Sequence, residues 1–384
     1  NTAKWLELAQ TNKDQAELVQ IKYGKQVTRL HKKTGKPCKT MVWDGMNLNS
    51  DKQVLNQLHK LGYKDLDSTG EKIIQHLYEK EPFVKDLLDF RMYDTRSTKY
   101  GFEWFNSWVE PDGKVYPDIF QREAETGRSS SRNPNGQNIP AKDTLEFREC
   151  FIPDPGNVLV DIDYGSQEPR VAAEFTQDPS LLAIFSSGKD IYVEVARIAF
   201  GEVIEKKDPR RKKMKDLTLA SFYGKTKWGL SRDLEISLEE AEDMLKKFHA
   251  AFPLVDERYV QVKYKQAQDY GYVTTLSGAK LWVNLYTNQW RNNAVNSPIQ
   301  GTSAEMLKVS VYESTVAWCG ENFYTNIPFI IPVHDEALSE YKTEDAQAAL
   351  EQASAIMLDV AQRFHPSVPA QVEAKICNNW AEAK

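Results

Sequence analysis

Residues 158–163 read VLVDID, and residues 328–340 read PFIIPVHDEALSE. Side chains alternate between the two faces of a strand, so the first stretch predicts a strand that carries Asp161 and Asp163 on one face. The second stretch predicts a hairpin whose turn, at 334–336, lies between two apolar strands. Together the two stretches predict a sheet that is assembled from distant pieces of the chain.

Acids at a strand end and at a neighbouring turn suit divalent cations. Two ions about 3.5–4 Å apart stabilise both the attacking and the leaving oxygen in phosphoryl transfer. Mg²⁺ favours a few carboxylates with substrate phosphates over a closed protein cage. The pattern points to Asp163 and Asp335 as ligands. Taken alone, each acidic tripeptide is more often a polar turn or a solvated strand face, so the assignment depends on the rest of the chain.

The remaining sequence alternates between helical and mixed segments. The first 110 residues or so show mainly helical spacing of apolar side chains, and residues 101–160 lose it. Helical spacing returns over about 180–285, with a long charged amphipathic stretch at 231–270, and a final helix is predicted over 343–364. This order predicts an α+β protein with a helical insertion between the two parts of its sheet.

A cationic helix is predicted inside that insertion. Asp208 is typical of an N-cap, and Pro209 is typical of a first helical residue. Side chains four residues apart then form one stripe that turns about 40° per step. The stripe contains Arg211, Lys215, Leu219 and Tyr223. Two cations followed by an apolar and an aromatic residue would suit a nucleoside triphosphate, although an ordinary amphipathic helix with a solvated basic face is the alternative.

The chain is acidic overall but contains two basic patches. The 384 residues carry a formal net charge of −6, yet cations gather at 22–39 and at 206–215. Local patches matter for phosphate binding more than total charge does. The 22–39 patch contains Lys22, Lys25, Arg29, Lys32, Lys33, Lys36 and Lys39.

Cysteine spacing and hydropathy exclude other classes. The four cysteines form no CxxC pair, which argues against a zinc site or a disulfide framework and favours an intracellular compartment. No apolar run reaches the ~18 residues of a membrane-spanning helix. Because Asn1 is not a start methionine, the chain is expected to be part of a longer protein.

Separated motifs occur in a distinctive order along the chain. They are TGRSS at 126–130, PNGQNIP at 134–140, DYGSQEPR at 163–170, the cationic helix with Gly224, NSPIQGT at 296–302 and VHDE at 333–336. These motifs closely resemble those of the family A DNA polymerases, the group of bacterial DNA polymerase I and of many phage and organelle replicases. The stretch EPFV at 81–84 is similar to the junction between thumb and palm in that family. The resemblance covers nearly the whole chain and favours the functional reading of each motif.

The resemblance implies a right-hand architecture of thumb, palm and fingers. The thumb would span residues 1–107, the palm 108–178 and 288–384, and the helical fingers 179–287. The palm would contain the antiparallel sheet, and the thumb with its basic patch would hold primer–template DNA. A proofreading exonuclease precedes the thumb in this family, and we expect none in this chain.

The resemblance also assigns metal and catalytic roles. Asp163 and Asp335, with the backbone carbonyl of Tyr164, would bind two Mg²⁺ ions, for which Mn²⁺ substitutes. Glu336 would be an auxiliary acid near the primer end. Lys215 would protonate the leaving pyrophosphate.

Nucleotide and DNA contacts follow from the same motifs. Residues expected near the incoming dNTP are Arg211, Lys215, Leu219, Tyr223, Tyr192 and Glu168. Among them, Glu168 would close the space beside the sugar 2′ carbon and so exclude ribonucleotides. Residues expected to touch primer–template DNA are Arg128, Asn138, Asn296, Gln300 and His334.

The chain departs from the family pattern at several positions. Leu219 stands where an aromatic residue is usual, and Tyr192 stands where histidine is usual, which puts the sugar pocket and one phosphate contact in doubt. The segment Gly165-Ser166-Gln167 replaces the usual Ser-Gln-Ile. Asp161 is expected to be a solvent-facing neighbour of Asp163.

Three other functions fit the sequence less well than a DNA polymerase does. A single-subunit RNA polymerase must accommodate a 2′-hydroxyl, which Glu168 opposes, and a two-metal nuclease has no need of the cationic stripe. A non-enzymatic descendant would be expected to have lost a catalytic aspartate. The predicted partners are primer–template DNA and dNTPs, with an RNA template left open, no membrane, and a monomeric chain in a bacterium, a phage-infected cell or an organelle.

Overall fold

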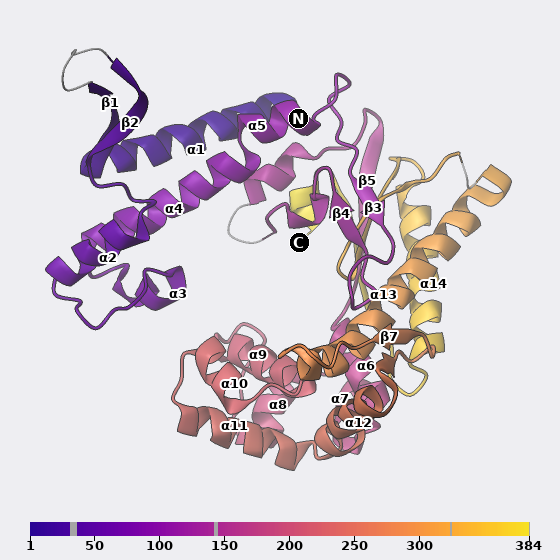
Figure 1. Ribbon diagram of the computed structural model, residues 1–384. Coiled ribbons are helices and arrows are strands. Elements are labelled where there is room, and N and C mark those ends of the chain that lie inside the picture. The colour runs from indigo at the N-terminus through magenta and orange to yellow at the C-terminus, as the bar shows by residue number, and fades with distance from the viewer. Residues whose placement is uncertain (31–36, 142–144, 323–324, 384) are drawn as a thin grey trace. The chain divides into compact units, whose positions relative to one another are not determined.

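The computed structural model describes residues 1–30, 37–141, 145–322 and 325–383, and it contains two compact units (Figure 1). Unit 1 comprises Asn1–Tyr116 and Pro140–Phe151, and unit 2 comprises Pro117–Ile139 and Ile152–Lys384. Within the described residues, no helix combines the length and the apolarity that crossing a bilayer requires.

Unit 1 is mostly helical. Its longest helices, α1 (Thr2–Tyr23) and α4 (Pro82–Tyr100), pack together. Helix α4 begins at the EPFV motif because Glu81 accepts the backbone N–H of Phe83 and Pro82 occupies the first turn. The other elements are α2 (Asp51–Lys60), α3 (Glu71–Ile74), η1 (Gln75–Leu77), α5 (Phe102–Trp108) and η3 (Leu145–Cys150).

A β-hairpin interrupts the predicted helical region. Strand β1 (Gly24–Leu30) pairs antiparallel with β2 (Pro37–Gly45). A Cβ atom on Gly24 would lie 2.5 Å from the backbone nitrogen of Met46, so only glycine allows this close approach at the base of the hairpin. Within the predicted basic patch, Lys32, Lys33 and Lys36 lie outside the described residues.

Unit 2 contains the predicted sheet. Its antiparallel strands follow the order β10-β5-β9-β8, so β5 is an interior strand. The bounds are β5 (Asn157–Tyr164), β8 (Phe329–Val333), β9 (Glu336–Lys342) and β10 (Val372–Cys377). The predicted strand, the predicted hairpin and the union of distant chain segments in one sheet are confirmed, and with them the α+β class.

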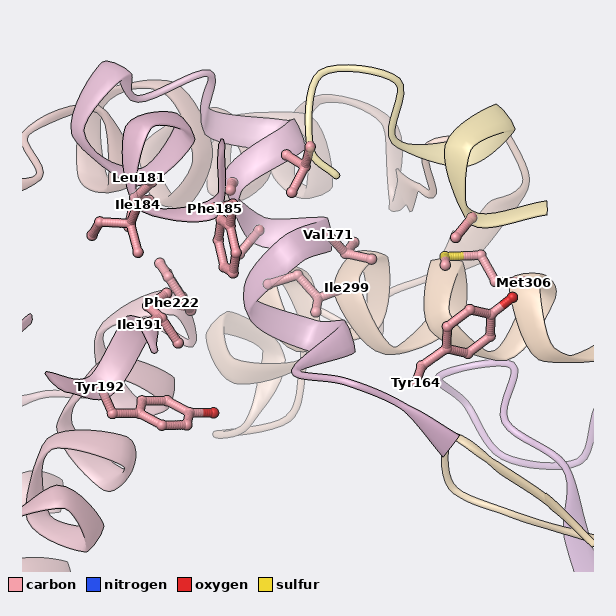
Figure 2. Packing of buried hydrophobic residues seen from close by; sticks show 14 of the residues in the cluster. Tyr164, Val171, Leu181, Ile184, Phe185, Ile191, Tyr192, Phe222, Ile299 and Met306 are labelled. Carbon is pink, nitrogen blue, oxygen red and sulfur yellow. The ribbon is translucent and has the colours of Figure 1, made fainter. Parts of the chain in front are cut away.

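Two long helices pack near the sheet and form much of the core. They are α13 (Trp290–Cys319) and α14 (Ala346–Phe364), the latter within three residues of its predicted start. Val158, Val160 and Ile162 of β5 belong to the same buried cluster as Ile299 and Met306 of α13. Figure 2 shows part of this cluster near Tyr164 and Met306. The apolar face of β5 is therefore fixed, and its other face carries the acids.

Helices occupy most of the chain between β5 and α13. They are α6 (Gln167–Thr176), α7 (Pro179–Ser186), α8 (Ile191–Phe200), α9 (Arg210–Phe222), α10 (Lys227–Leu234), α11 (Leu238–Ala251), η4 (Val255–Val260) and α12 (Gln261–Tyr270). The charged amphipathic stretch predicted at 231–270 is largely helical, but it is divided among α10, α11, η4 and α12. The chain turns at Glu235, which has a φ of 55°, and Ser237 caps a new helix by accepting the N–H of Glu240.

Short elements complete unit 2. Strand β3 (Asp118–Phe120) pairs with β4 (Ser130–Arg132), and β6 (Tyr272–Thr274) pairs with β7 (Lys280–Trp282). The 3-10 turns are η2 (Gly136–Asn138), η5 (Gly320–Asn322) and η6 (Trp380–Ala383).

Candidate nucleotidyl-transfer site

The two predicted metal ligands lie at the same end of neighbouring strands. Val333 and Glu336 are paired across the β8–β9 hairpin, so His334 and Asp335 form its two-residue turn. His334 has a φ of 62°, which such a turn requires and which histidine tolerates better than most residues. The backbone N–H of Tyr164, next to Asp163, donates to the carbonyl oxygen of Asp335 at 3.3 Å. This bond ties the strand end to the turn.

The environment of Asp335 disfavours its negative charge. Burial raises the pKa of its carboxyl, and the charge of Glu168 raises it further, whereas His334 and Arg128 act in the opposite direction. A bound cation would relieve this cost. Within the described residues, no group of three or more His, Cys, Asp or Glu side chains is placed to hold a metal. The two aspartates fit an ion such as Mg²⁺ that takes its remaining oxygen ligands from substrate and water.

The acid-bearing face of the sheet is more buried than predicted. Asp161 is only 3% exposed, so the expectation of a solvent-facing residue is wrong. Strand β5 has a neighbour on each side, and the C-terminal turn η6 contacts β10. From this turn the indole of Trp380 donates to Glu336 at 2.9 Å, and Glu336 is the cross-strand partner of Asp163. Glu336 itself is 1% exposed, and its carboxylate is held by that indole.

The side chain of Tyr164 is anchored away from the acids. Its hydroxyl forms hydrogen bonds with Ser310 Oγ at 2.7 Å and with the carbonyl oxygen of Met357 at 2.8 Å. The ring is buried beside Met306 (Figure 2). These bonds hold the backbone of Tyr164 at the end of β5, between Asp163 and the loop that leads to Glu168.

Glu168 joins residues from three distant motifs. It lies in the first turn of α6, and its carboxylate accepts hydrogen bonds from Arg128 and from the hydroxyl of Tyr223. Burial and the charge of Glu168 raise the pKa of the Tyr223 phenol, which also bonds with Gln300. These residues were predicted to have separate roles, and the structure brings them together around one carboxylate.

The cationic stripe of α9 rests on an aromatic ring. Asp208 accepts the N–H of Arg210, so the helix starts within one residue of the prediction. The guanidinium of Arg211 lies 5.0 Å, and the Nζ of Lys215 5.9 Å, from the ring centroid of Tyr192. Tyr192 is 4% exposed, and Figure 2 shows its ring projecting from α8. The ring fixes the two predicted triphosphate ligands relative to each other.

Asp190 is a site residue for which the sequence analysis assigned no role. It caps α8 by accepting the N–H groups of Tyr192 and Val193, and it accepts the Arg211 guanidinium at 2.7 Å. Burial opposes its charge, but Arg211 and the two N–H groups outweigh burial and hold the pKa of Asp190 below its ordinary value. The N-cap signature at Asp190 was visible in the sequence, but the ion pair depends on how α8 and α9 pack.

Four other residues predicted to contact DNA or the nucleotide lie on α13, η2 and α9. Asn296 and Gln300 are one turn apart on α13 and therefore share a face. The Oδ1 atom of Asn296 is buried and has no hydrogen-bond partner among the described residues. Asn138 is exposed at the end of η2, and Leu219 is partly exposed on α9.

Comparisons with known proteins agree with this geometry. Residues 14–382 match the family described as DNA polymerase family A. The chain is 30% identical to DNA polymerase I of Caldicellulosiruptor bescii over 95% of its own length and 44% of the relative. It is also 30% identical to the thermostable DNA polymerase I of Thermus aquaticus over 83% of its length and 38% of the relative. The chain thus spans less than half the length of these curated relatives.

A solved structure has a similar fold. It is the POL domain of Pol1 from M. smegmatis in complex with DNA primer-template and dNTP. The match has a TM-score of 0.82 and a sequence identity of 25%, and it covers 100% of this chain and 67% of the other.

Proposed function

Because the chain belongs to DNA polymerase family A, we propose that it is a template-directed DNA polymerase that adds deoxynucleotides to a primer 3′-hydroxyl. The observation that carries the proposal is the backbone bond from Tyr164, which follows Asp163, to the turn at Asp335, close to Glu168 and its partners. Acids alone would also suit a nuclease. The cationic stripe on Tyr192 favours a triphosphate substrate over a nuclease substrate.

Asp163 and Asp335, with the carbonyl oxygen of Tyr164, would hold two Mg²⁺ ions. When bound, such ions lower the pKa of the primer hydroxyl and neutralise charge on the pyrophosphate. The chain contributes carboxylates whose positions are fixed by the Tyr164–Asp335 backbone bond and by the anchored ring of Tyr164. Glu336 would serve as the auxiliary acid at the primer end, held in place by Trp380.

Arg211 and Lys215 would bind the triphosphate, and Lys215 would deliver a proton to the leaving pyrophosphate. Before a nucleotide arrives, Arg211 is paired with Asp190. A triphosphate therefore has to compete with that carboxylate or bind the guanidinium edge that Asp190 leaves accessible. The ring of Tyr192 takes the place of the usual histidine and contributes a surface for the cations.

Glu168 would exclude ribonucleotides, and Tyr223 would lie at the template–nascent pair beside Leu219. Arg128, Asn138, Asn296, Gln300 and His334 would contact primer–template DNA. The buried Oδ1 of Asn296 supports such a contact, because an unsatisfied buried acceptor costs free energy unless a ligand supplies a donor. Minor-groove edges offer the guanine amino group as that donor.

The names thumb (1–107), palm (108–178 and 288–384) and fingers (179–287) remain part of the proposal. So do a monomeric state and an intracellular location, and the proposal leaves acceptance of an RNA template open. The described residues of unit 1 are mostly helical and have a core of their own, as a thumb would require.

Primer extension by the purified chain tests the function. We expect extension with dNTPs on a DNA template in the presence of Mg²⁺ or Mn²⁺, and much slower extension with ribonucleotides. A parallel reaction on an RNA template decides whether that template is accepted. Degradation of the primer without extension would favour the nuclease and would overturn the proposal.

A further inference from the structure

The short hairpin β6–β7 has one buried and one exposed face. Val273 and Leu281 are paired across the hairpin and are buried, so their neighbours in each strand point the other way. Tyr272 and Trp282 are the next pair, and Trp282 is 74% exposed. Trp282 therefore leaves a large aromatic face open to a ligand on the exposed side of the hairpin.

Aromatic rings and a cation gather on the exposed face. The rings of Tyr272 and Trp282 lie 5.5 Å apart, and those of Tyr270 and Tyr272 lie 5.9 Å apart. The Nζ of Lys280 lies 4.7 Å from the centroid of the Tyr272 ring. We call Tyr270, Tyr272, Lys280 and Trp282 the aromatic platform. Rings interleaved with cations are typical of surfaces on which unpaired bases stack while their phosphates are neutralised.

The buried face of the hairpin lies against residues of the proposed DNA-binding motifs. The side chain of Leu281 contacts Gly301 so closely that a Cβ there would lie 2.7 Å from Leu281 Cδ1. Leu281 also packs on Gly127, which precedes Arg128. The aromatic platform therefore lies on the opposite face of the hairpin from two segments that are expected to contact primer–template DNA.

Cations continue from the aromatic platform toward those segments. Arg122 donates to the carbonyl oxygen of Lys280 at 3.3 Å, and Lys308 donates to the carbonyl oxygen of Gly127 at 2.7 Å. Burial lowers the pKa of Lys308; the charge of Glu305 opposes this lowering and the charge of Arg122 adds to it, so the two cations are neighbours with one acid close by. This positive path is complementary to a phosphate backbone.

We propose that the aromatic platform binds an unpaired nucleic-acid strand, the single-stranded template overhang, by stacking its bases. This inference rests on the proposed polymerase function. A duplex hides its base faces, whereas an overhang exposes them to Tyr272 and Trp282. Lys280 and Arg122 supply the phosphate contacts that link the overhang to the DNA-binding motifs.

Binding to primer–template DNA with overhangs of different length tests the aromatic platform. Fluorescence anisotropy would give the Kd for a one-nucleotide overhang and for an overhang of about twelve nucleotides, within the range one binding domain covers. For the wild-type chain we expect the longer overhang to bind roughly 5- to 100-fold more tightly. In Trp282→Ala that ratio should fall toward one, and in Trp282→Phe it should be largely kept. Lys280→Ala should lower the salt dependence of binding to the long overhang by about one charge.

Trp228→Ala is the matched control, because Trp228 is 65% exposed on α10 and lies outside the aromatic platform. The overhang ratio of this variant should equal that of the wild type. The inference would be overturned if the overhang ratio were unchanged in Trp282→Ala or fell equally in Trp228→Ala. Self-association of the chain through Trp282 in place of strand binding would also overturn it. Primer extension by the wild-type chain is measured on the same DNA. Failure of extension contradicts the polymerase proposal, and the Kd ratios decide separately on the aromatic platform.

Discussion

Glu168 is held from two sides before any nucleotide binds. Arg128 and Tyr223 both donate to its carboxylate, and its charge also acts on Asp335 and Tyr192. A side chain with two fixed partners has little freedom to move aside for a sugar 2′-hydroxyl. Its proposed role in excluding ribonucleotides thus has a physical basis in this chain.

Replacing Glu168 by alanine should weaken sugar selectivity. The variant opens space beside the sugar and removes the carboxylate there, so we expect the preference for dNTP over the matching ribonucleotide, measured as a ratio of kcat/KM, to fall by at least about tenfold. Glu174→Ala is a matched control on the same helix, because Glu174 accepts hydrogen bonds from Ser367 instead. Equal selectivity in wild type and Glu168→Ala would remove the proposed role.

Tyr192 should act through its ring more than through its hydroxyl. Tyr192→Phe keeps the surface under Arg211 and Lys215, whereas Tyr192→Leu removes the cation–π contact. Such contacts correspond to roughly a two- to thirtyfold change in binding, so KM for dNTP should rise by that factor in the leucine variant alone. Steady-state kinetics with varied dNTP measure this. A phenylalanine variant as impaired as the leucine variant would show that the hydroxyl matters instead.

The sequence predicted which residues belong to the site better than it predicted the burial and the partners of each side chain. The choice of Asp163 and Asp335 needed only strand alternation, a turn and a familiar motif order. Asp161 was wrongly expected in solvent, because its burial depends on its strand neighbours β9 and β10, which are distant from it in the sequence. The pairing of Asp190 with Arg211 was missed for the same reason, since it depends on the packing of two helices.

Secondary-structure elements were predictable where local signals agreed with tertiary packing. Strand β5 and the β8–β9 hairpin combine apolar runs with a turn, and both are confirmed. The β1–β2 hairpin was missed because its cations resemble those of a solvated helix face. The division of the 231–270 stretch was missed because Glu235 adopts a positive φ, which is not expected for a glutamate.

Helix α12 carries a buried lysine that should make stability depend on pH. Burial lowers the pKa of Lys263 from 10.5 to about 8, although Lys263 donates to the carbonyl oxygen of Thr274 at 2.9 Å. Below pH 8 both the folded and the unfolded chain bind the proton, and folding bears the full cost of the buried charge. Between about pH 8 and 10.5 only the unfolded chain still binds it, so this cost is relieved as pH rises.

Lys263→Met should therefore differ from the wild type in a pH-dependent way. The free energy of unfolding of the variant minus that of the wild type should fall by up to roughly 3 kcal/mol as pH rises through this window. Denaturant titrations at several pH values measure the difference. Lys265→Met is the control, because Lys265 is on the same helix but 77% exposed, and its hydrogen bond with Asp269 raises its pKa, so its difference should not fall as pH rises. A pH-independent difference for Lys263→Met would contradict the expected cost of charge burial.

The molecule as a whole is acidic, yet it is proposed to bind a polyanion. The net charge of −6 is outweighed locally by cations such as Arg128, Lys280 and Arg122. Affinity for primer–template DNA should then fall more than about tenfold between 50 and 200 mM salt, because each neutralised phosphate releases counterions. Anisotropy titrations across this range measure the slope, and a flat response would argue against phosphate contacts.

Asp163 and Asp335 together are proposed to form the catalytic centre of a DNA polymerase. Single-nucleotide incorporation under single-turnover conditions, with Asp163→Asn and Asp335→Asn beside the wild type, decides whether they do. We expect each variant to lose at least about a thousandfold in rate while its Kd for primer–template DNA changes by less than about fivefold. Asp161→Asn, on the same strand, should retain a much faster rate. Incorporation near the wild-type rate by either of the first two variants would contradict the claim.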